Sequence, residues 1–151
     1  MKQLYFLFFL LAAGLGLQAQ SSKQVQWVYA AKKVADKTYE LHITATIGEN
    51  YHMYAQDAGV EGPLPTTFKF AGNPLAVTDG KVKELGKVVK KFESAWNGSV
   101  NYYEKTVDFV QTVKLKGNVK TNVGGSVEFM VCNDNRCLPP STVEFKVNVG
   151  G

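Results

Sequence analysis

Two cysteines are the residues of this chain best suited to chemistry. The segment VCNDNRCLPP, residues 131–140, contains Cys132 and Cys137, the only cysteines among 151 residues. A thiol pair with so short a spacing has three common uses: a structural disulfide, part of a metal site, or a redox-active pair. The neighbouring residues and the rest of the chain bear on which use applies.

A disulfide between Cys132 and Cys137 would close only a short loop. The segment between them, residues 133–136, has the length of a hairpin connection, which can bring two sulfurs within bonding distance. Closing so short a loop contributes about 2 kcal/mol of stability, at the low end of the usual range. Accessible disulfides of this kind tend to be labile or catalytic. Spacing alone therefore leaves a structural and an exchanging disulfide equally open.

Pro139 and Pro140 follow the second cysteine closely. Because proline fixes φ and lacks an N–H, the segment Leu138-Pro139-Pro140 is expected to be stiff and extended. It either ends the edge of a strand or holds Cys137 at a fixed angle.

Metal and hydrolase chemistry receive little support. His42 and His52 lie far upstream of the cysteines, and no CxxC or HxxxH spacing is present. We interpret both histidines as ordinary polar residues. A copper site at His52 and Met53 would have too few ligands, and no GxSxG segment supports a serine nucleophile. We therefore expect no metal and no organic cofactor.

The N-terminal sequence MKQLYFLFFLLAAGLGLQAQ is typical of a secretory signal peptide. Lys2 supplies the positive start, an apolar core follows, and Ala19 is the small residue before cleavage. We assign residues 1–19 to the signal peptide and residues 20–151 to one exported domain. No later apolar run is long enough to span a membrane. We expect a periplasmic location, where cysteine pairs are usually oxidised.

The distribution of charge does not favour nucleic acid as a partner. The formal net charge is +4, but the lysines are scattered among acidic residues and no recognition motif accompanies them. We expect a monomer with a moderately basic surface.

Alternation of apolar and polar residues dominates the chain beyond the signal and predicts half-buried strands. The expected strands lie at residues 24–34, 38–47, 66–70, within 80–91, and at 107–115, 126–132 and 143–149. Turn signals such as Asn97-Gly98 and Gly124-Gly125 separate them. Seven to nine short strands in one domain predict an all-β fold, an immunoglobulin-like antiparallel β-sandwich. In that fold Cys132 ends one strand and Cys137 stands at the start of the next.

Aromatic residues gather in two segments rich in turn residues. They are Tyr51, Tyr54, Phe92, Trp96, Tyr102 and Tyr103. We expect most of them to pack in the core or at its corners, with Trp96 partly exposed because it precedes a turn. An aromatic ring beside a disulfide can shield the sulfurs from solvent and from stray thiols.

Three segments resemble a known family. CNDNRCLPPSTVEF resembles the cysteine motif of the N-terminal domain of the thiol:disulfide interchange protein DsbD, where a cysteine pair precedes a hydrophobic or aromatic residue, two prolines and a final strand. ENYHMYAQ resembles that family's Gly-Tyr-Tyr-rich segment. SAWNGSVNYYEKTVDFVQTVKL resembles its cap loop and the strand that follows. Together the matches cover most of residues 38–149.

The resemblance implies an immunoglobulin-like domain whose cysteine pair shuttles electrons in the periplasm. It implies that Cys137 forms the intermolecular disulfide and that Cys132 resolves it. Trp96 would take the place of the cap aromatic, and Tyr51 and Tyr54 would flank the site. The implied partners are thioredoxin-like exported proteins, isomerases, cytochrome c maturation proteins and a membrane thiol reductase.

The chain also departs from the family pattern. Its cysteine turn is one residue shorter than in the best-known members, and Ser94-Ala95 replaces an acidic pair beside the cap aromatic, leaving Glu93 as the nearby carboxylate. The transmembrane reductase and C-terminal thioredoxin-like domains have no counterpart in this sequence. We therefore expect a stand-alone form that receives electrons from a separate protein.

Two other functions remain open at this stage. One is an immunoglobulin-like binding module that docks a partner while its disulfide stays inert. The other is a structural accessory subunit of an envelope complex. Both predict a disulfide that resists reduction, whereas a carrier needs one that is cycled.

Overall fold

The computed structural model describes residues 20–151, so the expected signal peptide lies outside the described residues. Strands dominate this part of the chain, and all of their pairings are antiparallel. The elements are η1 (Gln20–Gln24, a 3₁₀ helix), β1 (Val25–Ala35), β2 (Thr38–Ile47), β3 (His52–Tyr54), β4 (Thr67–Phe70), β5 (Ala76–Leu85), β6 (Val89–Glu93), β7 (Gly98–Tyr103), β8 (Thr106–Leu115), β9 (Thr121–Phe129), β10 (Val131–Cys132) and β11 (Ser141–Val149). Within residues 20–151, no helix is long and apolar enough to cross a membrane.

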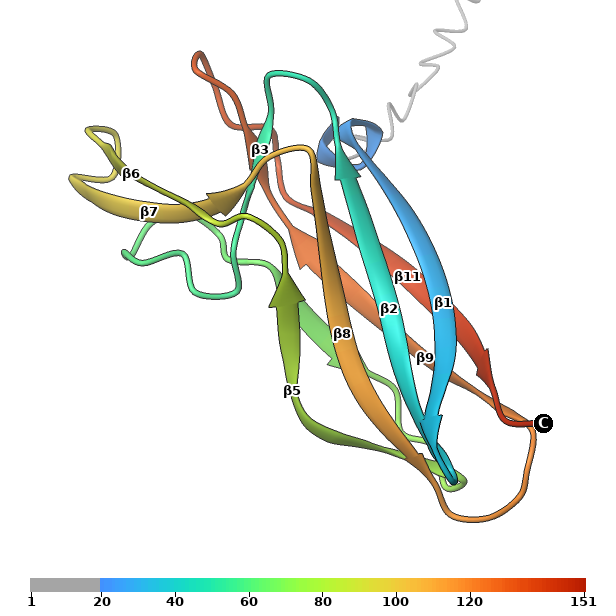
Figure 1. Ribbon diagram of the computed structural model, residues 1–151. Coiled ribbons are helices and arrows are strands. Elements are labelled where there is room, and N and C mark those ends of the chain that lie inside the picture. Colours follow the sequence, from blue (N-terminus) through green and yellow to red (C-terminus); the bar gives the residue numbers. More distant parts are fainter. Residues whose placement is uncertain (1–19) are drawn as a thin grey trace, which may run out of the picture.

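The strands form three sheets (Figure 1). The sheet β1-β2-β8-β5 and the sheet β11-β9-β4 pack around the main hydrophobic core. The third sheet, β10-β3-β7-β6, projects from one end of this sandwich. The predicted all-β, immunoglobulin-like antiparallel sandwich is confirmed. Cys132 belongs to the third sheet, at the end of β10, and Cys137 lies next to it outside the strands.

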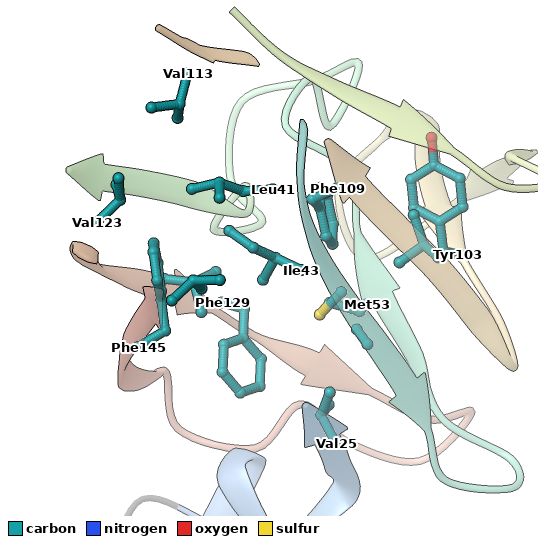
Figure 2. Close-up of a cluster of buried hydrophobic side chains, with 14 of the residues drawn as sticks. Val25, Leu41, Ile43, Met53, Tyr103, Phe109, Val113, Val123, Phe129 and Phe145 are labelled. Carbon is teal, nitrogen blue, oxygen red and sulfur yellow. The ribbon is translucent and has the colours of Figure 1, made fainter. Parts of the chain in front are cut away.

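Side-chain alternation explains how the main core forms. Along β2 each odd-numbered position from 39 to 47 is buried, and each residue between them is at least partly exposed. The core draws from both sheets, as Figure 2 shows for Ile43, Phe109, Phe129 and Phe145. The ring of Trp27 meets that of Phe129 edge-on at 5.2 Å between centroids. Burying such rings is the main favourable term in the stability of the sandwich.

Gln111 interrupts the apolar stripe of β8 for a structural reason. It is buried, and its side-chain amide donates to the carbonyls of Asp79 at 3.0 Å and Gly80 at 3.3 Å. The register of β5 against β8 shifts between Asp79 and Lys83. The glutamine therefore hydrogen-bonds to backbone carbonyls at the point where the ladder becomes irregular.

The turn predicted at Gly124-Gly125 is wrong, because both glycines lie inside β9. Gly125 is paired on both sides, with Phe145 of β11 and Phe70 of β4. A Cβ at this position would come 2.4 Å from the carbonyl oxygen of Lys69 and 2.7 Å from the Phe145 ring. Glycine is needed here because the backbone of the neighbouring strand β4 comes so close, and not because the chain turns.

The segment around the cysteines changes sheets. β9 ends at Phe129, and one residue later β10 pairs with β3 in the third sheet. The single strand predicted over residues 126–132 is thus two strands in two sheets. β11 begins at Ser141, so Cys137 lies in the connection before it and not at the start of the strand.

Candidate functional site

Cys132 and Cys137 are joined by a disulfide. Their sulfurs are 1.97 Å apart and their Cα atoms 3.9 Å apart. The two residues face each other as an isolated antiparallel bridge. Next to them the N–H of Leu138 donates to the carbonyl of Val131 at 2.9 Å. The bond therefore closes a short, regular turn at the end of β10.

The turn between the cysteines is held by Asn133. Its N–H donates to the carbonyl of Arg136, and its side-chain oxygen accepts from the N–H groups of Asn135 and Arg136, each at 2.9 Å. Asparagine favours turns because its side chain can bond to backbone two or three residues onward. The position of Cys137 is thus fixed by local hydrogen bonds as well as by the disulfide.

The two sulfurs differ in exposure. Cys132 is 2% exposed and belongs to a second hydrophobic cluster, together with Tyr54, Val100 and Met130. Cys137 is exposed to solvent. A thiol of another molecule can therefore approach the Cys137 side of the bond, whereas the Cys132 side is covered by protein.

A cleft of about 430 Å³ opens beside the disulfide. One wall is the cysteine turn, residues 132–137, and the other is the end of β6 with the loop after it, residues 91–96. His52 and Tyr54 of β3 complete the lining. The cleft thus brings together side chains from three separate segments of the sequence, two of which are strand connections.

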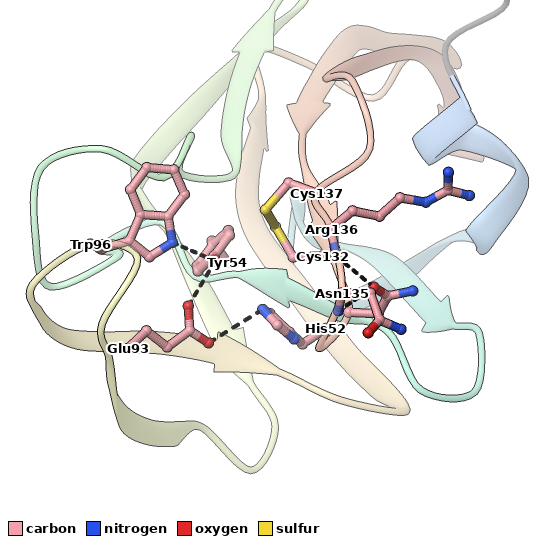
Figure 3. Close-up of polar contacts among 9 residues, drawn as sticks. His52, Tyr54, Glu93, Trp96, Cys132, Asn135, Arg136 and Cys137 are labelled. Carbon is pink, nitrogen blue, oxygen red and sulfur yellow. Dashed lines mark hydrogen bonds and ion pairs between the residues drawn. A yellow bond between two sulfur atoms is a disulfide. The ribbon is translucent and has the colours of Figure 1, made fainter.

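A hydrogen-bonded chain crosses this cleft (Figure 3). The indole Nε1–H of Trp96 donates to the Tyr54 hydroxyl at 3.0 Å, and that hydroxyl donates to the carboxylate of Glu93 at 3.2 Å. Burial is the main cause that raises the pKa of Tyr54 to about 12, with Glu93 adding to it. The hydroxyl therefore stays protonated and keeps its donor role.

Trp96 sits in a tight turn that we call the cap, residues 94–97. The N–H of Trp96 donates to the carbonyl of Glu93 at 3.1 Å, and Asn97 has a φ of 50°. Gly62 packs on the indole so closely that a Cβ there would lie 2.4 Å from the ring. Trp96 is partly exposed, as predicted. In Figure 3 the Tyr54 ring stands between the indole and the disulfide, and Cys137 is left uncovered.

His52 belongs to this site, although the sequence suggested only an ordinary polar residue. It pairs directly with Cys132 across β3 and β10 and is 9% exposed. Its Nε2 lies 3.7 Å from a carboxylate oxygen of Glu93. Burial is the largest cause that lowers the pKa of His52, and Glu93 opposes it. The family resemblance pointed to Glu93 as the carboxylate near the cap aromatic, whereas His52 carries no sequence signal that would have placed it beside the sulfurs.

The remaining expected site residues lie farther out. Tyr51 packs against the main core and lines a different depression, which Thr46 and Lys105 also line. Pro139 and Pro140 are exposed, and the Pro139 carbonyl accepts a 2.6 Å hydrogen bond from the hydroxyl of Ser21. The first residues of the described chain thereby anchor the segment that follows Cys137.

Arg136 precedes Cys137 in the sequence, and a cation so close to a cysteine could favour its thiolate. It lines the cleft, but in Figure 3 its guanidinium points away from the sulfurs. No group of three or more histidine, cysteine or acidic side chains suited to a metal occurs within residues 20–151.

The fold and site define a class of protein, an immunoglobulin-like sandwich that carries a half-exposed disulfide in an open cleft. A family model described as thiol:disulfide interchange protein DsbD, N-terminal, matches residues 19–149. The chain belongs to this family, as its motifs predicted. The family and the bonded cysteine pair together identify a thiol–disulfide interchange domain.

Solved structures share the fold. The N-terminal domain of DsbD from Neisseria meningitidis, in its reduced form, aligns with a TM-score of 0.56 at 18% identity, over 86% of this chain and 89% of that one. The N-terminal periplasmic domain of ScsB from Proteus mirabilis aligns with a TM-score of 0.58 at 15% identity, over 83% of this chain and 46% of that one. No curated protein sequence matches the chain significantly.

Proposed function

We propose that this domain is an exported, monomeric carrier of reducing equivalents in the periplasm. It takes electrons from a membrane thiol reductase and passes them to thioredoxin-like or isomerase partners, including those of cytochrome c maturation. The unequal exposure of the pair carries this proposal, since Cys132 is buried and Cys137 is open to solvent. A structural staple gains nothing from such asymmetry, whereas exchange needs one accessible and one protected sulfur.

The transfer of electrons to a partner takes two thiol–disulfide exchange steps. The Cys137 thiolate attacks a sulfur of the partner's disulfide, forming a mixed disulfide and releasing the partner's second sulfur as a thiolate that takes up a proton. The Cys132 sulfur, losing its proton, then attacks Cys137. The partner leaves with both sulfurs reduced, and the Cys132–Cys137 bond is formed. Two electrons and two protons pass to the partner.

The cleft offers a place for a partner to dock beside Cys137. Trp96 and Tyr54 are joined by a hydrogen bond and line this cleft, and Cys137 on its other wall is exposed to solvent. We assign Trp96 the role of the cap aromatic and Tyr54 that of its anchor. Pro139 and Pro140 hold the chain extended after Cys137. Tyr51 lies outside this cleft and supports it only through the core.

The test of this function is to trap the partner. The Cys132→Ala variant, exported in cells, is expected to accumulate as a mixed disulfide through Cys137, because the resolving thiol is missing. Non-reducing electrophoresis followed by mass spectrometry identifies the trapped protein. The Cys132→Ala/Cys137→Ala double variant is the control and should trap nothing.

Failure to trap a partner would contradict the carrier function. If neither single-cysteine variant traps a thioredoxin-like or reductase partner, the carrier function is wrong. A binding module with an inert disulfide would then be the better description, and it predicts that the double variant keeps its function.

A further inference from the structure

His52 and Cys132 are held on the same face of the third sheet. They form a directly opposed pair in the antiparallel contact of β3 with β10. Side chains of such pairs project to the same side, with Cβ atoms about 4.5–5.5 Å apart. Both residues line the cleft. The backbone register therefore places an imidazole beside the buried sulfur, and not beside the exposed Cys137.

The imidazole is fixed in place but not saturated with hydrogen bonds. Its ring centroid lies 4.3 Å from that of Tyr102 and 5.3 Å from that of Tyr54, the latter edge-on. Nε2 is buried and has no hydrogen-bond partner within residues 20–151. A buried nitrogen without a partner is costly and calls for an explanation. The Nε2 of His42 is also without a partner in the described part of the chain, but only that of His52 belongs to a residue that lines the cleft beside the disulfide. The rings of Tyr54 and Tyr102 therefore hold the His52 imidazole in place, while its Nε2 remains able to bind a proton.

Charged groups around His52 come from several elements. Glu93 and Lys91 of β6, Glu104 after β7 and Asp134 of the cysteine turn act on its charge. The titratable rings of Tyr54 and Tyr102 contact the imidazole. Burial is the dominant cause and lowers the pKa of His52, which keeps the ring neutral near neutral pH. The carboxylate of Glu93, 3.7 Å away, would stabilise a positive charge formed there transiently.

We propose that His52 accepts the proton of the Cys132 thiol as Cys132 attacks Cys137 to release a bound partner. This inference rests on the proposed exchange function and adds a residue to its second step. The family resemblance gives no role to this histidine. The cross-strand pairing, the free buried nitrogen and the nearby carboxylate together carry it.

The release of the partner begins with proton transfer from Cys132 to His52. The S–H bond of Cys132 breaks and its proton passes to the neutral imidazole. The Cys132 sulfur bonds to the Cys137 sulfur, and the bond from Cys137 to the partner's sulfur breaks. The partner's sulfur leaves as a thiolate and receives the proton from the imidazolium, directly or through solvent. His52 thereby returns to its neutral form and is ready for the next transfer.

A small disulfide reagent separates the two steps without any cellular partner. Reduced protein is mixed with dithiobis(nitrobenzoate), and attack by Cys137 releases the first coloured thiolate. Attack by Cys132 on the resulting mixed disulfide releases the second. The Cys132→Ala variant should release only the first, which assigns the phases. Only the second phase should depend on His52.

The His52→Gln variant removes the proton acceptor while keeping a polar side chain. At neutral pH we expect its first phase to be unchanged and its second phase to slow by about tenfold to a hundredfold. The difference should shrink as the pH rises, because hydroxide then removes the Cys132 proton without help from an imidazole. His42→Gln, which changes the histidine paired with Asp108 on β2 and β8, is the matched control and should leave both phases unchanged.

Two results would overturn the role of His52. One is a second phase of normal rate in His52→Gln, and the other is a second phase slowed by the same factor at every pH, which indicates structural damage. These outcomes are independent of the trapping experiment, because the reagent replaces the partner. A failure to trap a protein in cells would thus refute the carrier function and leave the reagent result standing.

A measurement on the unaltered protein covers the case in which His52→Gln does not fold. Nuclear magnetic resonance can follow both imidazoles with pH in the oxidised and reduced states. In the reduced protein we expect the His52 titration to contain a second step from the ionisation of Cys132, which the disulfide form lacks. Identical His52 curves in the two states would contradict the proposal.

Discussion

Replacing Cys137 with alanine is expected to slow thiol exchange by about a hundredfold, although Cys132 remains. Cys132 is 2% exposed and sits in a hydrophobic cluster, so an incoming disulfide cannot reach it without a local opening of the fold. An opening that costs about 3 kcal/mol slows the reaction by about a hundredfold. The rate of reaction of reduced Cys137→Ala with dithiobis(nitrobenzoate) measures this loss directly.

Cys132→Ala is the matched control for this result. It removes a cysteine of the same pair and the same disulfide, yet leaves the exposed Cys137, so its single thiol should react at the rate of the first phase of the unaltered protein. If both single variants reacted equally fast, the sulfurs would have equal access and the assignment of unequal roles would be wrong.

Replacing Phe109 with alanine should have the largest effect on stability. The Phe109 side chain is fully buried on β8, and its ring centroid lies 4.9 Å from that of Phe68 and 6.2 Å from that of Trp27. Truncating a buried phenylalanine costs about 3–5 kcal/mol, through lost burial and the cavity left behind. Against a typical stability of about 5–15 kcal/mol, this is a large part of the whole. Urea unfolding of the oxidised protein measures it.

Phe92→Ala gives the comparison at an exposed position. Phe92 is 62% exposed on β6, so its removal should change the free energy of unfolding by less than about 0.5 kcal/mol. Equal costs for the two phenylalanines would contradict the packing of the core between the sheets.

The sandwich could be predicted because its signal is local. Alternation along β2 specifies a strand and its buried face within a few residues, and the same holds for β8 and β11. The error at Gly124-Gly125 has the opposite origin. Gly125 avoids a clash with Lys69 and Phe145, which come from other parts of the chain. No local pattern distinguishes that use of glycine from a turn.

The candidate site was predictable only in part, for the same reason. The cysteines and Trp96 lie within contiguous motifs, so they could be found from short stretches of sequence. His52 depends on the register between β3 and β10, two very short strands far apart in the chain. Glu93 reaches the cleft because β6 pairs with β7, and β7 pairs with β3. Such long-range pairings set the chemistry around the sulfurs, and the isolated segments do not reveal them.

The most direct test of a cycled disulfide is its reduction potential. The protein is equilibrated in buffers of defined thiol–disulfide ratio, and the fraction of reduced Cys132–Cys137 pair is determined by thiol alkylation and mass spectrometry. We predict a potential less negative than about −300 mV, in the range of exchange proteins. A potential more negative than about −300 mV would mark a structural disulfide and contradict electron transfer through this pair.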